Sequence, residues 1–215
     1  MLNQAFQCED VPAQMMDQLW AAGWRHFGSQ FFRYSHTIEA NEVKLIQPLR
    51  IRLARFSMRK THRRLLKQLD HLDCIVEPAA IRADTEALFH RHKQRFTENI
   101  PEQLTDFLST EPATVPCPCL EFRLQAAKTL IAASFLDTGA TSTSSIYGLF
   151  DPAHPTRSPG ILTMLLEIQW SIENGHEFYY PGYATRESGL YDYKKQFRRL
   201  EFLDWFSGAW MSLDI

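Results

Sequence analysis

Apolar residues in the first part of the chain follow a helical spacing and then an alternating one. They recur at helical spacing over Val11–Gly23, where Gly23 supplies a C-terminal stop, and this predicts an opening helix. The Phe-rich segment Arg25–Tyr34 and the alternating segment Val43–Leu53 are predicted as two strands of a small sheet. The chain therefore opens with a helix followed by strands.

Both kinds of pattern continue to the middle of the chain. A helix is predicted over Met58–Leu69, with leucines on one face, arginines on the other and Ser57 as its cap. The later elements of this region are a strand over Cys74–Glu77, helices over Arg82–Phe96 and Ile100–Leu108, and a Pro-rich loop over Glu111–Pro118. We interpret that loop as a connection within the fold and not as a domain linker.

Strand-like patterns dominate beyond that loop. The predicted elements are strands over Leu120–Gln125, Lys128–Thr138 and Ser144–Phe150, a helix over Gly160–Asn174 and a strand over Glu177–Tyr180. The first two strands look like an antiparallel pair. The order predicts an α+β fold, and it suits an acetyltransferase-like arrangement around a central cleft as well as other α+β domains.

The composition fits a protein that is folded almost throughout. The chain has 215 residues, of which 45% are hydrophobic and 22% charged, and this is ordinary for a globular domain and unlike a disordered chain. Its longest apolar stretches, such as Ala126–Phe135, fall short of the roughly 20 residues that a membrane span requires. The N-terminus has no signal-peptide pattern. We therefore expect a cytoplasmic protein without a membrane helix.

The four cysteines are expected to be free thiols, because the cytosol is reducing. Cys8 and Cys74 are isolated in the sequence. Cys117 and Cys119 are separated by one residue, which is closer than the usual Cys-x-x-Cys metal clip, and the sequence has no second pair to complete a site. We therefore expect neither a metal nor a cofactor.

Positive charge is concentrated in one block. Arg50–Lys67 contains eight Arg or Lys residues and no Asp or Glu. Such a block can follow a phosphate backbone, and it can equally be the solvated face of a helix. If it binds RNA, the candidate residues are Arg59, Lys60, Arg63 and Arg64, joined by Lys195 and Arg198 near the C-terminus.

Several ordered motifs mark the second half of the chain. Ser145–Trp170 contains a strand ending in Tyr, an aromatic-Asp-Pro turn, Arg-Ser-x-Gly and a long apolar helix, and Tyr179-Tyr-Pro-Gly-Tyr and Tyr193-Lys-Lys-Gln-Phe-Arg-Arg-Leu-Glu follow. Together they resemble the C-terminal domain of the arginyl and leucyl protein transferases. The segment Gly189–Phe197 is also similar to the terminal motif of the Fem enzymes, which use aminoacyl-tRNA on the same fold.

The N-terminal half resembles the same family, with departures. The similar elements are Gly23-Trp-Arg-His-Phe-Gly, Gln47-Pro-Leu-Arg-Ile, Phe56-Ser and Arg63-Arg. Between the first two, Ser35–Ile46 has no cysteine, whereas the family normally carries a cysteine cluster there. Gln196 stands where Arg is usual, and Pro181 where Leu is usual.

The resemblance implies a GNAT-like acyltransferase fold with a small N-terminal α/β subdomain, divided into residues 1–78 and 79–215. It implies an enzyme that transfers leucine or arginine from aminoacyl-tRNA, its co-substrate, to the α-amino group of a protein N-terminus such as Asp or Glu. The acceptor amine attacks the ester carbonyl, so the protein must position two substrates, stabilise an oxyanion and take up a proton.

Site residues follow from the same motifs. The candidate catalytic residues are Lys194, Tyr193 and Asp151, with Lys194 as a cation for the oxyanion or the terminal tRNA phosphate. The candidate substrate-binding residues are Tyr147, Arg157, Ser158, Tyr180, Gly182, Tyr183, Arg186 and Gln196. Glu167 and His176 are weaker candidates for a base.

Three of these assignments have ordinary structural alternatives. Lys194 can also be a surface lysine in a basic patch with Lys195, Arg198 and Arg199. Ser158 and Pro159 suit an anion site at a helix start, but they suit a helix cap and first turn equally well. Asp151-Pro152 is also a common turn pair. Two other functions stay open, namely a CoA-dependent GNAT N-acyltransferase, against which the glycine-poor loop argues, and a catalytically silent homologue that binds tRNA or N-termini.

Overall fold

The computed structural model describes residues 1–39, 41–97, 100–189 and 191–213. Its helices are α1 (Ala13–Ala21), α2 (Lys60–Leu66), α3 (Ala83–Lys93) and α4 (Pro159–Glu173), with 3-10 turns η1 (Leu53–Arg55), η2 (Lys67–His71), η3 (Leu104–Asp106) and η4 (Asp192–Gln196). Its strands are β1 (Asn3–Gln7), β2 (Arg25–Phe27), β3 (Gln30–Tyr34), β4 (His36–Glu39), β5 (Glu42–Arg52), β6 (Asp73–Pro78), β7 (Cys119–Ala126), β8 (Thr129–Thr138), β9 (Ser142–Phe150), β10 (Phe178–Thr185), β11 (Leu200–Leu203) and β12 (Trp210–Ser212). In the described part, no helix is long and apolar enough to span a membrane.

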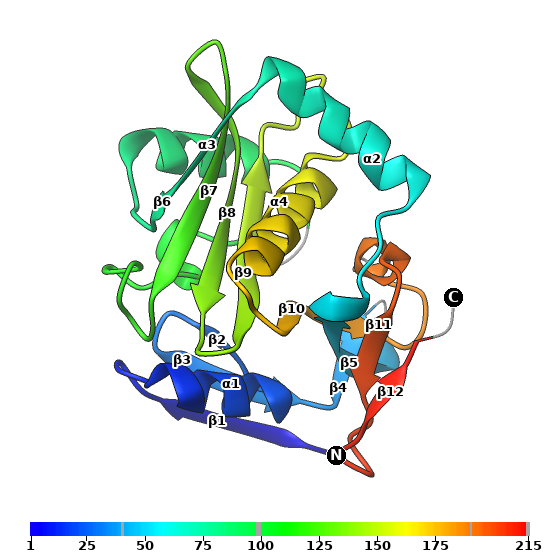
Figure 1. The fold of residues 1–215 in the computed structure, drawn as a ribbon. Coiled ribbons are helices and arrows are strands. Elements are labelled where there is room, and N and C mark those ends of the chain that lie inside the picture. The colour runs from blue at the N-terminus through cyan, green and yellow to red at the C-terminus, as the bar shows by residue number, and fades with distance from the viewer. Residues whose placement is uncertain (40, 98–99, 190, 214–215) are drawn as a thin grey trace.

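Two sheets organise these elements, as Figure 1 shows. The small sheet has the order β1-β3-β2, and α1 lies beside it. The large sheet has the order β12-β11-β5-β10-β9-β8-β7-β6, with β4 paired to β5. The structure is therefore a mixed α+β fold, in agreement with the class predicted from the sequence.

Helices cover both faces of the large sheet. On one face, α4 packs Leu165 and Ile168 against Ile51 of β5 and Leu136 of β8. On the other face, α3 packs Leu88 against alternate β8 residues such as Phe135. β8 is buried on both faces, which explains why its sequence is almost continuously apolar.

The large sheet opens where β9 and β10 separate. These strands run parallel and pair only at Phe178↔Ser142, Tyr179↔Thr143 and Tyr180↔Ser144. The next residue of β10 is Pro181, which has no N–H to donate to a ladder. The pairing of β10 with β5 shifts register between Tyr179 and Gly182, and β9 shifts register against β8 next to Ser145. Beyond these points β9 and β10 are no longer paired with each other.

The second half of the chain follows the predicted order. The antiparallel pair is confirmed as β7 and β8, the third strand as β9, and the long apolar helix as α4. The spacing of apolar residues is enough to predict these elements, because each of them buries either both of its faces or one clear apolar stripe.

The first half contains several corrections. Arg25–Tyr34 is not one strand but the hairpin β2–β3, since Gly28 turns the chain in a left-handed conformation (φ 51°). Val43–Leu53 corresponds to β5, which joins the large sheet and not the small one. Of the helix predicted over Ile100–Leu108 only the turn η3 forms. Ser57 does not cap α2, which begins after Arg59. The strand β1 was not predicted at all.

The proposed division at residue 78 stays a prediction. Strands from both sides of that boundary share the large sheet, because β5 pairs with β10 and β6 pairs with β7.

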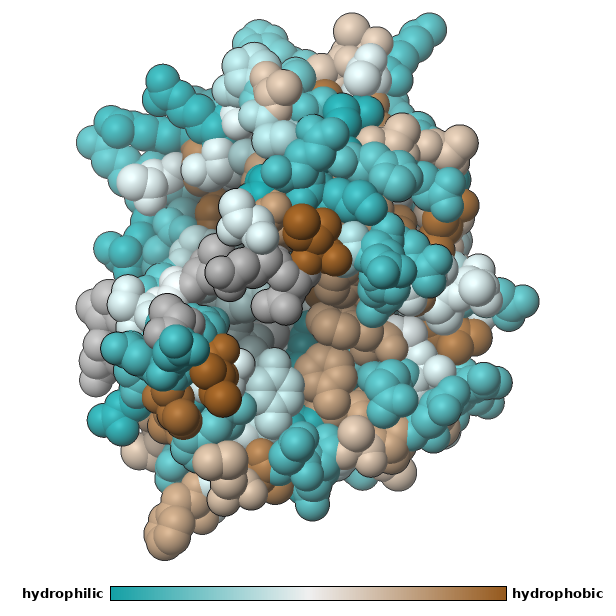
Figure 2. All heavy atoms as spheres, turned by 180° about the vertical axis from the view of Figure 1, so that it is seen from behind, coloured by the Kyte–Doolittle hydropathy of each residue, from teal (hydrophilic) through white to brown (hydrophobic). Residues whose placement is uncertain are grey.

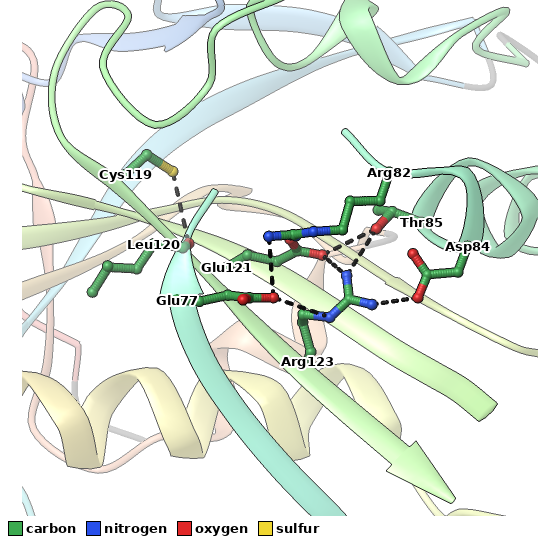
Figure 3. A network of polar contacts seen from close by, with 8 residues as sticks. All are labelled: Glu77, Arg82, Asp84, Thr85, Cys119, Leu120, Glu121 and Arg123. Atoms are coloured by element: carbon green, nitrogen blue, oxygen red, sulfur yellow. Dashed lines mark hydrogen bonds and ion pairs between the residues drawn. The ribbon is translucent and has the colours of Figure 1, made fainter. Parts of the chain in front are cut away.

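A buried polar network holds α3 to the edge of the large sheet (Figure 3). The carboxylate of Glu121 on β7 is 0% exposed and accepts hydrogen bonds from Thr85, Arg82 and Arg123. Arg123 is also buried and pairs with Asp84 at the start of α3. A carboxylate this deep is tolerable only because several donors meet it, so the network fixes how α3 sits on β7.

Candidate active site

A cavity of about 510 Å³ lies where β9 and β10 part. Its walls come from the diverging ends of these two strands, from the first turns of α4, from η4 and from the hairpin β2–β3. Figure 2 shows a recess at the middle of one face of the molecule, bordered by both apolar and hydrophilic side chains. The cavity thus uses both halves of the chain.

Arg25 lies at the point where the two strands separate. It is the first residue of β2 and is only 8% exposed. Its guanidinium donates one hydrogen bond to the Ser144 hydroxyl and another to the Ser145 carbonyl. Ser145 follows the last β9 residue that pairs with β10, so Arg25 supplies a donor at the position where the parallel pairing ends. Burial lowers the pKa of Arg25, but a guanidinium still remains charged at neutral pH.

Lys194 reaches into the same space from η4. Its Nζ donates to the Tyr183 carbonyl at 3.3 Å and lies 4.6 Å from the centre of the Tyr191 ring. Gly182 makes this approach possible, because a Cβ there would lie 3.1 Å from Lys194 Nζ. Gly182 also has φ 98°, which favours glycine.

The surroundings of Lys194 favour its neutral form. Burial and, to a smaller extent, the charge of Arg25 together lower its pKa to about 7, while Glu167 opposes the shift. An ordinary lysine has a pKa near 10.4. The motif predicted a cation at this position, whereas the structure gives a side chain that gains and loses its proton near neutral pH.

Glu167 lies in the core behind the cavity. It is 0% exposed on α4, and its Oε2 accepts a hydrogen bond from the Tyr179 hydroxyl at 2.6 Å. Burial raises the pKa of Glu167 to about 7, against the lowering effect of that hydrogen bond. Since it does not line the cavity, it acts on the site through its charge and not through contact with a substrate.

Aromatic rings form much of the cavity wall. Tyr147 stacks on Phe107 with ring centres 3.9 Å apart, and Phe107 meets Phe27 edge to face at 5.0 Å. The Tyr147 hydroxyl is buried and has no hydrogen-bond partner among the described residues. Tyr183 differs, because its hydroxyl donates to the Gly23 carbonyl at 2.5 Å and is thereby fixed. The wall therefore combines apolar surface with polar groups left for a ligand, among them the Tyr147 hydroxyl.

Six residues predicted from the sequence meet in this cavity. They are Tyr147, Ser158, Gly182, Tyr183, Tyr193 and Lys194. Ser158 is the residue before α4, as predicted, but its backbone is left-handed (φ 49°) and its side chain makes no capping hydrogen bond among the described residues. Pro159 begins the helix, as expected for its fixed φ.

Other predicted residues lie outside the cavity lining. The Asp151 carboxylate pairs with Arg91 at 2.8 Å and also accepts the Ala153 N–H, so it closes a turn and does not face the cavity. Tyr180 is buried in an apolar cluster with Trp20. The remaining residues are Arg157 and Arg186, which are exposed, Gln196, which donates to the Tyr193 carbonyl, and His176, which stacks on Trp170. Leu190, within the Gly189–Phe197 motif, lies outside the described residues.

The basic candidates lie mainly on one helix. Leu65 and Leu66 of α2 pack toward the core, which leaves Lys60, Arg63 and Arg64 exposed, with Arg59 partly covered. Arg198 is exposed, whereas Lys195 pairs with Asp192 at 2.7 Å. This arrangement suits a solvated face as well as RNA, and both interpretations stay predictions.

The motifs had assigned no individual role to Arg25 or to the aromatic residues Phe27, Phe32 and Phe107. Arg25 belongs to the quoted Gly-Trp-Arg element, and that element was the available signal. One further cluster, His26, Cys117 and Asp137, has the ligand types and spacing to hold a metal ion, and it is the one such group in the described part of the chain.

The environment of Glu167 predicts a measurable pH dependence. Because its pKa is raised in the folded state, the folded protein holds that proton more tightly, and stability falls as pH rises from about 4.5 to 7. The contribution is at most about 3 kcal/mol. We expect Glu167→Gln, which cannot ionise, to remove this part of the pH dependence in urea unfolding measured from pH 4.5 to 7.5. Glu173→Gln, on the exposed end of α4, is the matched control and should leave it unchanged. If the free energy of unfolding of Glu167→Gln fell with rising pH as steeply as that of the wild type, the raised pKa of Glu167 would be contradicted.

Two solved structures share the fold over almost the whole of this chain. L-PGS from Bacillus licheniformis matches 97% of this chain with a TM-score of 0.55 and 12% identity, and the chain spans 65% of that structure. The C-terminal domain of a putative lysylphosphatidylglycerol synthetase from Agrobacterium fabrum matches 95% of this chain with a TM-score of 0.55 and 15% identity, over 69% of that structure. At these identities the likeness concerns the fold alone.

Relatives of known name are more similar in sequence. The aspartate/glutamate leucyltransferase of Marinobacter nauticus is 30% identical over 210 residues, which cover 94% of this chain and 84% of the relative. That of Helicobacter hepaticus is 25% identical over 206 residues, covering 92% and 83%.

The family described as arginine-tRNA-protein transferase, C terminus, matches residues 85–204. This span is more than half of the chain, and it includes β9, α4, β10 and η4, which build most of the cavity. The resemblance seen in the motifs is confirmed, and the chain belongs to the arginine-tRNA-protein transferase family.

Proposed function

We propose that the protein transfers leucine or arginine from aminoacyl-tRNA to the α-amino group of a protein N-terminus such as Asp or Glu, in the cytoplasm and on a GNAT-like fold. The observation that carries this proposal is Lys194, a lysine with a pKa of about 7 beside the buried cation Arg25 in a cavity between parting strands. The names of the relatives support the reaction class.

The chemistry needs one proton to be moved. The neutral acceptor amine attacks the ester carbonyl, a C–N bond forms, the C–O bond breaks, and the ribose hydroxyl of the tRNA leaves. The amine must lose a proton and the leaving oxygen must gain one. Neutral Lys194 accepts the first proton and, as an ammonium, returns it to the leaving oxygen. Since its pKa is about 7, both forms are accessible at neutral pH.

Arg25 supplies the charge that does not change. Its guanidinium is fixed by Ser144 and Ser145 and borders the cavity, so it favours negative charge that develops on the carbonyl oxygen without having to reorient. The two basic residues thus have separate roles, in which Lys194 transfers the proton and Arg25 stabilises the oxyanion.

Arg95 is the best-placed residue for the carboxylate of an acidic acceptor. Arg157 and Arg186, which the sequence analysis gives as substrate-binding candidates, do not line the cavity, whereas Arg95 does and is exposed at its edge. Its guanidinium lies 4.8 Å from the centre of the Phe150 ring, which limits its mobility. Lys60, Arg63 and Arg64 on α2 are proposed to meet the tRNA backbone.

The alternatives have less support. The segment Ser158–Gly160 at the start of α4 contains a single glycine, Gly160. The backbone there therefore has little freedom to wrap a diphosphate, as a CoA enzyme requires. A catalytically silent homologue has no need of a lysine with a lowered pKa in an open cavity.

The role of Lys194 can be tested by two substitutions. In a transfer assay with labelled leucyl- and arginyl-tRNA and an Asp-initiated peptide, Lys194→Ala should lower kcat about 100-fold or more, because the proton acceptor is lost. Lys194→Arg should be equally impaired, since arginine keeps the charge but cannot take up a proton.

Lys128→Ala is the matched control, because Lys128 is exposed in the turn between β7 and β8 and does not line the cavity, and it should stay near wild type. Near wild-type turnover in Lys194→Arg would show that charge alone is needed and would overturn the proton-transfer role. If the wild-type protein transfers no amino acid from any aminoacyl-tRNA, the proposed transferase function is wrong.

The role of Arg95 predicts a selective loss. Arg95→Gln should raise KM for an Asp-initiated peptide about tenfold, the effect of losing one charge-assisted hydrogen bond, while kcat changes little. KM for the matching Asn-initiated peptide should not change. An equal effect on both peptides would mean that Arg95 does not recognise the carboxylate.

A further inference from the structure

Four potential metal ligands converge between the small sheet and the large one, beside the substrate cavity. His26 comes from β2, Asp137 from β8, Cys117 from the loop before β7, and Cys119 from the first position of β7. All four are at least 96% buried. Ligand types of this kind rarely meet in a protein interior without a partner that uses them.

The distances place three of them, His26, Cys117 and Asp137, in one coordination-sized group. His26 Nε2 lies 2.5 Å from Asp137 Oδ2, and the ligand atoms of His26, Asp137 and Cys117 all lie within 4.8 Å of one another. Cys119 is the direct cross-strand neighbour of Asp137, and its thiol donates to the Leu120 carbonyl at 3.7 Å, so the thiol has to turn toward the other three ligands to complete the group. The cysteine spacing alone gave no site, because the other two ligands come from distant strands.

The orientation of His26 matches that of a metal ligand. Its Nδ1 lies 2.8 Å from the Gly28 carbonyl, and a carbonyl can only accept, so Nδ1 carries the hydrogen. In the neutral ring, Nε2 then directs a lone pair at the Asp137 carboxylate, which is itself an acceptor. A cation or an additional proton must lie between them. A backbone carbonyl that fixes the far nitrogen is the usual support of a metal-bound histidine.

We propose that His26, Asp137, Cys117 and Cys119 bind one Zn²⁺ ion as a closed, tetrahedral structural site. Two sulfurs, one imidazole nitrogen and one carboxylate oxygen are a ligand set that Zn²⁺ accepts, and full burial leaves no open position for catalysis. Zn–ligand bonds of about 2.0 to 2.3 Å require the thiols to close in and the His26–Asp137 pair to open slightly. The two thiols release their protons to solvent when the metal binds.

Charge balance supports a divalent ion. Two thiolates, one carboxylate and Zn²⁺ leave a net charge of −1 in the site. Arg25, next to His26 in sequence, interacts with Asp137 electrostatically and offsets that charge. The ion would fasten β2 to β7 and β8. It would thereby also hold Arg25, the first residue of β2, whose guanidinium contacts β9 where β9 and β10 separate.

The test begins with the wild-type protein. After expression in zinc-containing medium and exhaustive dialysis, elemental analysis should find about one zinc per chain. Replacement by Co²⁺ should produce thiolate-to-cobalt charge-transfer absorption and the intense visible bands of tetrahedral cobalt. Removal of the metal by a strong chelator should lower Tm.

Variants identify the ligands. Cys117→Ser and Cys119→Ser should each lower the bound zinc at least tenfold and abolish or shift the cobalt spectrum, whereas Cys74→Ser, at an exposed position of β6, should change neither. If a ligand variant does not fold, the wild-type zinc content and cobalt spectrum still decide. Metal-free wild-type protein with no cobalt spectrum would overturn the proposal and leave a simple His26–Asp137 ion pair. Transfer activity is not a readout here, so failure of this proposal and failure of the proposed reaction remain distinguishable.

Discussion

The early end of the pairing between β9 and β10 is the constraint on which the site depends. Two parallel strands that start side by side normally stay paired, because each unpaired backbone group inside a protein costs free energy. Here Pro181 removes one donor from β10, and both strands shift register against their outer neighbours at this point. The sheet remains continuous at one end and opens at the other, with no break in the chain.

Arg25 makes this opening stable. It reaches from the small sheet to the hydroxyl of Ser144 and the carbonyl of Ser145, at the place where β9 has lost β10. The N-terminal part of the chain is therefore not an appendage, since it supplies a donor that the gap in the large sheet requires. The same guanidinium then acts on Lys194, whose pKa it helps to lower. Arg25 thus stabilises the fold and also helps to determine the pKa of the lysine in the cavity.

Sequence reasoning succeeded where one local pattern decides the outcome. α4 and the antiparallel strands β7 to β9 were predicted, because their apolar spacing reflects burial directly. It failed where tertiary contacts decide. β5 alternates like any strand, and nothing in that pattern tells which sheet it joins. Ser158 looked like a helix cap, yet its left-handed backbone turns the hydroxyl away from that role.

The site shows the same division. Lys194 and Gly182 were found because they lie in motifs, and the structure explains their relation, since the glycine leaves room for the ammonium. Asp151 also lies in a motif, as the Asp of the aromatic-Asp-Pro turn, but its side chain pairs with Arg91. Cys117 and Cys119 were dismissed on their spacing, because His26 and Asp137 are brought to them only by strand pairing and by the hairpin β2–β3.

The most direct measurement is the pKa of Lys194, determined by NMR titration of lysine side chains labelled with ¹³C at Cε and assigned with Lys194→Arg. A value near 7, as the burial beside Arg25 requires, would support the account. A value near 10.4, that of a solvated lysine, would show that the cavity does not desolvate this side chain, and it would contradict the role in proton transfer.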